Sequence, residues 1–367
     1  MHFFNDFPYL MGVISFFVGL CFMPVVIKIA KQKNFVVKPN KRTSHKGAVP
    51  NVGGINILIS FCLTLLLFSY NAILGSQFLI IGIFIIVLVG FTDDLIDLRF
   101  SWKFIGEFAS AFFLIVLADV RLTSLHGFLG IFEIPLVFSY LLSFFVFIVI
   151  INALNLIDGV DGLASGLSIL YCLFFGIYFT LAGHIGLASS AFILVGSLAV
   201  FFIYNVFGNK RKIFMGDSGS LLLGYMMTFY VFLFCEYNAT NNIPHYLHIG
   251  SAPAVAICVL AVPLFDTLRV VCTRIKKGVS PFYPDKNHIH HLLLKTGLKH
   301  REVTVVLLSV TMAFIGLGIL GRNWKIEILT SVVFFISCAL TYVLWGIINK
   351  KNRESNSKSH NQTGTTS

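Results

Sequence analysis

Long apolar stretches alternate with short polar segments along almost the whole chain. A transmembrane helix needs about 20 predominantly apolar residues, and stretches near this length are typical of membrane spans. The pattern predicts eleven helices, and the third and fourth are short enough that ten full spans remain an alternative. The predicted helices cover about 11–30, 53–70, 78–91, 104–118, 134–151, 164–182, 185–207, 220–235, 251–272, 303–320 and 326–348.

Composition assigns these helices to a bilayer rather than to a soluble core. Of the 367 residues, 57% are hydrophobic and 12% are charged, whereas soluble domains average roughly 45–50% and about 25%. This excludes a soluble enzyme, a nucleic-acid-binding domain and a disulfide-bonded secreted module. The seven cysteines form no Cys-x-x-Cys pair, so we interpret them as small packing residues. The predicted fold is an all-α polytopic membrane protein.

The basic residues indicate how the helices are oriented. The segments that the eleven-helix pattern places on one side carry 24 of the 27 Lys and Arg residues, and those on the other side carry 3. Because cytoplasmic loops are enriched in Lys and Arg, the first side is predicted to be cytoplasmic. The N-terminus is then outside and the C-terminus inside. The net charge of +11 is a topology signal, and no nucleic-acid partner is expected.

The pattern predicts a single transmembrane domain over residues 1–349 and a polar tail over 350–367 that should be disordered. Eight of the ten Asp residues fall on or near the cytoplasmic face, although orientation rules do not require this. Carboxylates among basic loops indicate a site for a metal ion and a phosphorylated ligand at that face. The loops expected to form it cover about 31–52, 92–103, 152–163, 208–219 and 273–302.

The first acidic motif follows the third predicted helix and contains Asp93, Asp94 and Asp97. Residues three or four apart share one face of a helix, so a continuing helix would present these carboxylates together. Like charges this close repel one another, and a divalent cation would relieve the repulsion. The alternative is an ordinary solvated helix end.

The second motif is a polar stripe that leaves the apolar helix ending near residue 151. Its members step by three residues, and two glycines free the backbone to turn or to approach a ligand. Polar groups in such a position are costly unless they have partners, which favours a binding site over a simple Asn/Asp/Gly turn. The stripe consists of Asn152, Asn155, Asp158 and Asp161.

The third motif runs from Phe214 to Ser220 and is predicted to enter a helix at about Ser220. Its glycines and the helix start offer backbone N–H groups to a phosphate, and Asp217 could hold a metal beside it. Serine proteases carry the same Gly-Asp-Ser-Gly string, but nothing here places a base beside Ser218. The upstream residues 210–212 are either topological anchors or phosphate contacts.

The fourth motif gathers three histidines, His288, His290 and His291, in the longest cytoplasmic loop. Asp285 is predicted to cap a short helix that Gly297 ends. A zinc site is the sharpest alternative, but Cys partners and the usual ligand spacing are missing, and Asp-rich neighbours favour Mg2+. Histidines that bind phosphate or orient the site are the preferred interpretation, against a plain surface loop.

Taken in this order, the motifs resemble those of the polyprenyl-phosphate N-acetylhexosamine-1-phosphate transferases, and most closely the bacterial WecA type. The segments 38–40, 45–47 and 50–55 add to the resemblance, which covers residues 38–297. It implies an integral-membrane enzyme that moves N-acetylglucosamine-1-phosphate from a UDP-sugar to undecaprenyl phosphate and releases UMP. It also implies the bacterial inner membrane and a role in a surface polysaccharide such as O antigen. A homodimer is left open.

The resemblance further implies roles for individual residues. Asp217 and Asp94 would hold Mg2+, or Mn2+ in its place, and Asp161, Asn205 and Phe214 would bind the uridine. Asn155 and Asp158 would line the nucleotide-sugar site, and His290 and His291 would contact the diphosphate. The full expected set is Asp93, Asp94, Asp158, His290 and His291 as catalytic residues, with Lys46, Asp97, Asn152, Asn155, Asp161, Asn205, Phe214 and His288 as substrate-binding residues.

Two other function classes stay open from the residues alone. An intramembrane prenyltransferase would also use Asp-rich motifs with Mg2+, but it would need two similar motifs and the chain has one. A transporter would place ionisable residues at the middle of the membrane and show inverted repeats. Here the ionisable residues are expected at the ends of the spans.

Overall fold

A computed structural model of the protein describes residues 7–37, 49–68, 77–240, 243–280 and 287–363, and most of them are helical. Lys46 and Asp285 lie outside these ranges. The helices at the start and middle of the chain are α2 (Pro8–Gln32), α3 (Gly53–Phe68), α5 (Gln77–Ile96), α6 (Phe100–Phe112), α7 (Leu136–Ile157), α8 (Leu163–Leu181), α9 (Ile185–Phe207) and α10 (Gly216–Ala239). They are followed by α11 (Ala252–Val259), α12 (Ala261–Lys276), α13 (Ile289–Lys295), α14 (His300–Leu320) and α15 (Ile326–Thr363).

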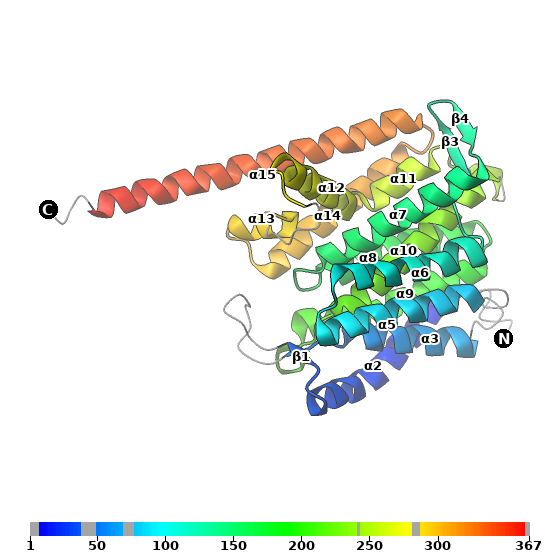
Figure 1. The fold of residues 1–367 in the computed structure, drawn as a ribbon, viewed down its shortest axis with the longest axis horizontal. Coiled ribbons are helices and arrows are strands. Elements are labelled where there is room, and N and C mark those ends of the chain that lie inside the picture. Colours follow the sequence, from blue (N-terminus) through cyan, green and yellow to red (C-terminus); the bar gives the residue numbers. More distant parts are fainter. Residues whose placement is uncertain (1–6, 38–48, 69–76, 241–242, 281–286, 364–367) are drawn as a thin grey trace.

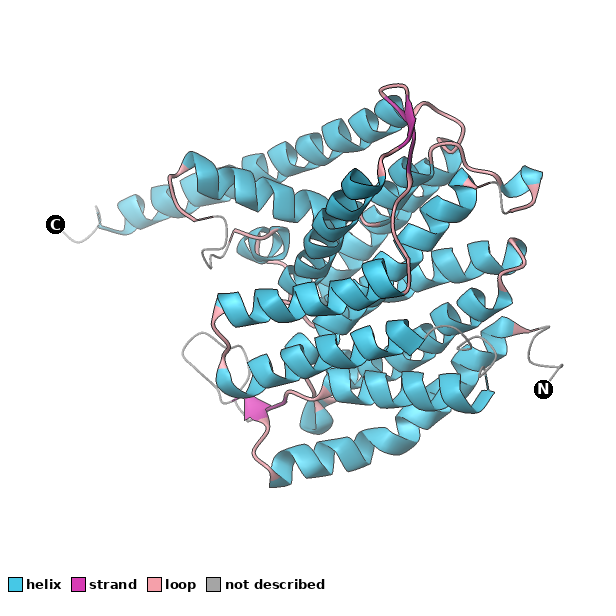
Figure 2. Ribbon diagram, turned by 45° about the vertical axis from the view of Figure 1, so that its right-hand side comes forward, coloured by secondary structure: helices cyan, strands magenta, loops and turns pink. Residues whose placement is uncertain are grey.

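Strands are few among the described residues and form two short antiparallel pairs. β1 (Val36–Val37) pairs with β2 (Val49–Pro50), and β3 (Ser124–Phe128) pairs with β4 (Ile131–Glu133). Figure 1 shows β1 and α13 at one end of the helix bundle and the β3–β4 hairpin at the other, and Figure 2 shows the same separation of the strands.

The predicted all-α membrane fold is confirmed. Within the described ranges, nine helices are long and apolar enough to cross a membrane, and the pair α11–α12 makes a tenth if it counts as one span. Each of the eleven predicted stretches is helical. The prediction misjudged which stretch is short, because α5 has 20 residues and α6 continues through a π-helical turn to Leu117, whereas α3 has only 16.

The ninth predicted helix is broken rather than straight. α11 ends at Val259, and α12 sets off at 82° to it. Pro263 explains the break, because its ring would clash with the carbonyl group four residues earlier and it has no N–H group for the helical ladder. The bend lets α12 carry Asp266 to the end of the bundle that holds α13.

α10 is the central helix, and α3, α5 and α7 pack against it. In the most apolar 18-residue stretch of α10, 94% of the residues are buried. Glycines permit close approach where α10 begins. A Cβ atom on Gly54 would lie 2.2 Å from the backbone nitrogen of Gly219, and one on Gly90 would lie 2.5 Å from that of Ser218. The first turn of α10 is therefore held directly against α3 and α5, which brings the first and third sequence motifs together.

The last helix extends into the C-terminal tail. α15 continues as a helix to Thr363. No Gly or Pro interrupts residues 350–363, so nothing in this segment breaks the helix that begins at Ile326. The expected disorder of residues 350–367 stays a prediction.

Candidate active site

Two carboxylates at the end of α5 point in different directions. Asp93 accepts a hydrogen bond from the backbone nitrogen of Leu98 at 2.7 Å and forms an ion pair with Lys103 at 2.9 Å. Asp94 turns instead to the start of α10 and accepts from the backbone nitrogens of Asp217 and Ser218 at 2.8 and 3.1 Å. Asp94 therefore caps α10, where the helix dipole favours a negative charge.

The capping position of Asp94 is fixed from two sides. Asn51, beside β2, donates to Asp94 at 2.8 Å. Gly216 has a φ of +75°, and a Cβ atom there would lie 2.5 Å from an Asp94 oxygen. A residue other than glycine would meet both backbone strain and this contact. The third motif thus begins helix α10 at Gly216, four residues earlier than predicted.

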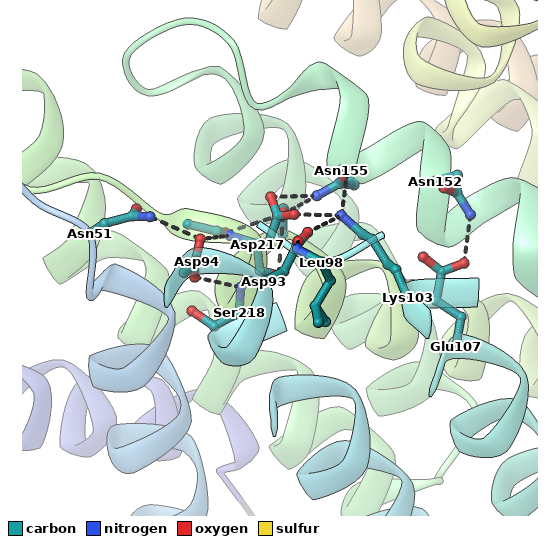
Figure 3. A network of polar contacts seen from close by, with 12 residues as sticks. Asn51, Asp93, Asp94, Leu98, Lys103, Glu107, Asn152, Asn155, Asp217 and Ser218 are labelled. Atoms are coloured by element: carbon teal, nitrogen blue, oxygen red, sulfur yellow. Dashed lines mark hydrogen bonds and ion pairs between the residues drawn. The ribbon is translucent and has the colours of Figure 1, made fainter. Parts of the chain in front are cut away.

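Lys103 lies at the centre of the site (Figure 3). Its ammonium group contacts Asp93 and Asp217, and the side-chain oxygen of Asn155 lies 3.5 Å away. Asn155 in turn donates to Asp217 at 3.1 Å and to Ser220 at 2.8 Å. Three helices, α5, α7 and α10, therefore supply the groups that surround the ammonium group that α6 provides.

A second polar pair lies deeper in α6. Asn152 donates to Glu107 at 2.8 Å, and Glu107 is only 2% exposed. Glu107 stands two turns into α6, so the expectation that ionisable residues lie only at span ends is wrong for this side chain. Figure 3 shows Glu107 on the same helix as Lys103 and turned towards Asn152.

The loop between α7 and α8 joins this cluster to the other segments at the same end of the bundle. Burial raises the pKa of Asp158 to about 7, and the nearby charges of Asp217, Asp94 and Asp161 add to the shift. Asp161 forms an ion pair with Lys212 at 2.6 Å, and Lys212 also lies over the ring of Phe214 at 5.6 Å. The loop therefore places beside the Lys103 cluster one carboxyl group whose ionised form is disfavoured and one that is paired with a lysine.

Asn205 connects two backbone segments in this region. Its side-chain oxygen accepts from the backbone nitrogen of Gly162 at 2.6 Å, and its amide nitrogen donates to the carbonyl of Ile213 at 2.8 Å. Asn205 thus fixes the α7–α8 loop against the segment before α10. Its expected contact with uridine stays a prediction.

The histidine motif packs against the same loop. His288 contacts Asp266 at 2.9 Å and takes the N-cap position of α13 that the sequence had assigned to Asp285. His290 is buried, and a Cβ atom on Gly159 would lie 2.3 Å from its Nε2 atom. Burial lowers the pKa of His290 to about 3, with a further contribution from His291. His290 is therefore neutral at physiological pH, as a donor or acceptor beside the α7–α8 loop.

The structure brings together most of the predicted site residues. Asp97 is the exception within the described ranges, because α5 ends at Ile96 and Asp97 adopts a φ of +51° with an exposed side chain. It does not continue the helical face of Asp93. The residues that share contacts at this end of the bundle are Asp93, Asp94, Asn152, Asn155, Asp161, Asn205, Phe214, Asp217, His288, His290 and His291. Asp158 lies near the charges of Asp94, Asp161 and Asp217.

Sequence reasoning missed Asn51, Lys103, Glu107 and Asp266 as site residues. Lys103 had been interpreted only as a basic anchor for topology. A usable signal was present, since Lys103 and Glu107 stand four residues apart in an apolar stretch. Opposite charges with that spacing face each other on a helix, and ionisable residues inside a span mark functional sites.

The donor set suits a hard divalent cation. Carboxylate and amide oxygens of Asp93, Asp217 and Asn155 converge on the ammonium group of Lys103. Within the described ranges, no three His, Cys, Asp or Glu side chains form a complete metal cage. Mg2+ does not need one, because proteins usually hold it through one or two carboxylates together with water and substrate phosphates.

Comparison with known proteins assigns the chain to a family. Residues 76–235 match the model described as glycosyl transferase family 4. The chain is 30% identical over 318 residues to the undecaprenyl-phosphate alpha-N-acetylglucosaminyl 1-phosphate transferase of Escherichia coli K12. The matched region covers 84% of this chain and 84% of that protein. The chain belongs to glycosyl transferase family 4. The family resemblance inferred from the motifs is thereby confirmed.

Two further relatives span even more of the chain. The enzyme of the same name from Yersinia pestis is 29% identical over 92% of this chain and 90% of its own. The probable undecaprenyl-phosphate N-acetylglucosaminyl 1-phosphate transferase of Bacillus subtilis is 28% identical over 92% of each. The likeness thus includes all four motifs, beyond the segment that the family model matches.

Proposed function

We propose that this membrane protein transfers N-acetylglucosamine-1-phosphate from UDP-N-acetylglucosamine to undecaprenyl phosphate and releases UMP. The names of its relatives support both substrates. The observation that carries the proposal is the convergence of Asp93, Lys103 and Asp217 at one end of an apolar helix bundle. There a water-soluble nucleotide sugar can meet the phosphate of a lipid whose chain stays in the bilayer.

The arrangement fits the needs of phosphoryl transfer. This reaction asks the protein mainly to align the reacting groups and to neutralise charge. Asp217 and Asp93 would hold Mg2+, or Mn2+, and the ion would neutralise the diphosphate charge as it builds on the leaving UMP. Asp94 holds the start of α10 in place, and Asp161 and Phe214 lie where the uridine is proposed to bind.

The remaining proposed roles follow the positions of the loops. His290 and His291 are placed against the α7–α8 loop, close to Asp158, and would contact the diphosphate. The cell membrane of a bacterium supplies the lipid acceptor, so we place the enzyme in the cytoplasmic membrane with this end of the bundle facing the cytoplasm. Downstream of it, the lipid-linked sugar would enter the assembly of a surface polysaccharide such as O antigen.

The experiment is a turnover assay with purified protein in detergent. UMP should appear from UDP-N-acetylglucosamine only when undecaprenyl phosphate and Mg2+ are both present, and EDTA should stop its release. A prenyltransferase would instead release diphosphate from a prenyl donor. A transporter would bind substrate without producing UMP. Either of these results would contradict the proposal.

A further inference from the structure

The ammonium group of Lys103 occupies the point where the oxygens of the site converge. It contacts Asp93 and Asp217 on two different helices and lies 3.5 Å from Asn155. The side chains of Lys103 and Asp93 are 15% and 11% exposed, and that of Asp217 is 34% exposed. The pair of Lys103 and Asp93 is thus largely removed from water, and opposite charges attract each other more strongly there than at a surface. The Asp217 carboxylate still reaches solvent.

A divalent cation cannot simply be added to this arrangement. Bound by Asp217 and Asp93, it would lie beside the Lys103 ammonium and bring three positive charges against two carboxylates. Like charges at such short range repel strongly in a site with little water. Either the ion stays out or the ammonium group moves away.

Glu107 offers the place to which it can move. It stands four residues after Lys103 on α6, and residues with this spacing are neighbours on one helix face. Its carboxyl group is 2% exposed and is held by Asn152 at 2.8 Å. Asn152, which holds Glu107, and Asn155, which holds Asp217, lie three residues apart on the same face of α7. The carboxyl groups of Glu107 and Asp217 are therefore adjacent but separate.

We propose that Lys103 is a built-in competitor for the metal position. In the ligand-free protein its ammonium group neutralises Asp93 and Asp217, and a divalent cation binds by displacing it towards Glu107. Glu107 is then a positioning residue that acts through Lys103. The inference rests on the proposed metal site and adds to it a competing cation and a receiving carboxyl group.

The test measures Mn2+ binding without substrates, by electron paramagnetic resonance of free Mn2+ in titrations of the full-length protein. Lys103→Met removes the competing charge at similar side-chain length, and it should tighten Mn2+ binding at least about tenfold. Lys212→Met is the matched control, since it removes a positive charge from the ion pair with Asp161 on the same face. Equal tightening by both variants, or none by Lys103→Met, would overturn the proposal.

A double-mutant cycle tests the role of Glu107. Glu107→Gln keeps an oxygen that can accept from Asn152, so the packing is preserved. It should weaken Mn2+ binding about three- to tenfold when Lys103 is present and leave it unchanged in the Lys103→Met background. Equal weakening in both backgrounds would mean that Glu107 acts on the ion directly, and the receiving role would be rejected. If Lys103→Met does not fold, Lys103→Gln takes its place in both measurements.

Asp217→Asn separates this inference from the proposed function. If Asp217→Asn binds Mn2+ as the wild-type protein does, the metal position is wrong and the competitor role of Lys103 is refuted with it, while the proposed transfer reaction is decided separately by UMP release. If Asp217→Asn loses Mn2+ while Lys103→Met gains nothing, the metal site stands and only the competitor role is refuted.

Discussion

The acidic side chains of the site have different hydrogen-bond and ion-pair partners, and these partners indicate different roles. Asp94 is held by backbone N–H groups at the start of α10, which is a structural bond pattern. Asp217 is held by Lys103 and Asn155, which are side chains that can move. A metal ion can therefore replace the partners of Asp217 at little cost to the fold, whereas replacing those of Asp94 would uncap a helix.

We expect Asp217→Asn to abolish transfer while the protein still inserts and folds. The substitution removes a formal charge from the proposed metal site at nearly constant volume, and loss of one such electrostatic contact costs about a hundredfold or more in rate. UMP release in saturating Mg2+ measures it. Asp119→Asn is the matched control, because Asp119 forms an ion pair with Arg121 in the segment after α6 and lies outside the site. Wild-type turnover by Asp217→Asn would refute the metal assignment.

Asp161 and His291 should affect different kinetic constants. Asp161→Ala is expected to weaken UDP-N-acetylglucosamine binding by about 1–3 kcal/mol, because a carboxylate that accepts from the uracil N3–H would be lost and its partner left unpaired. His291→Ala should mainly lower kcat, as expected for a diphosphate contact that strengthens in the transition state. Titration at saturating lipid phosphate, with calorimetry of UMP binding, separates the two. The reverse pattern would show that the roles are exchanged.

At the scale of the elements, the α7–α8 loop is the part that links the two halves of the site. Asp158 and Asp161 lie in it, Asn205 fixes its backbone, and Gly159 meets the ring of His290. The loop follows helix α7, whose last turn supplies Asn155 to the Lys103 cluster. A displacement of this loop would therefore disturb both the acidic cluster and the histidines.

Gly159→Ala should produce that displacement. The added Cβ atom would lie 2.3 Å from Nε2 of His290, and the buried ring has little room to yield. Overpacking of this kind costs typically about 1–3 kcal/mol, so both the melting temperature and the affinity for UMP should fall. Gly316→Ala in α14 is the control, because nothing lies within 4 Å of its added atom. Unchanged UMP affinity in Gly159→Ala would mean that the loop and His290 do not cooperate in binding.

The elements were predictable where a local rule decides them. Apolar runs gave the eleven helical stretches because spanning a bilayer needs length and composition alone. The break before Pro263 also follows a local rule, but a hydrophobicity pattern does not include it. The roles of Lys103 and Glu107 depend on which helices become neighbours, and a hydrophobicity pattern contains no such information. The acidic motifs were found because their residue types are unusual in an apolar chain, whereas Lys103 resembled every other basic residue near a span end.

At the scale of the whole molecule, the segments that contribute to the site lie at one end of the bundle, as their contacts show. Asn51 contacts Asp94, Lys103 contacts Asp217, and Gly159 adjoins His290. The β3–β4 hairpin lies at the opposite end (Figure 1). The two ends of the bundle thus differ in chemistry, because the site residues lie at only one of them. This agrees with the strong bias of Lys and Arg to one side.

This difference between the two ends predicts which positions reagents can reach from each side of the membrane. In a variant whose seven native cysteines are replaced, Lys33→Cys and Lys299→Cys should react with a membrane-impermeant maleimide only after the cells are opened. Leu129→Cys and Tyr246→Cys, at positions whose side chains are 73% and 70% exposed, should react in intact spheroplasts. The positive-inside rule is the reason, because it predicts that the basic side of the bundle faces the cytoplasm. Labelling of Lys33→Cys or Lys299→Cys from outside would invert the topology and remove the site from the compartment that holds UDP-sugars.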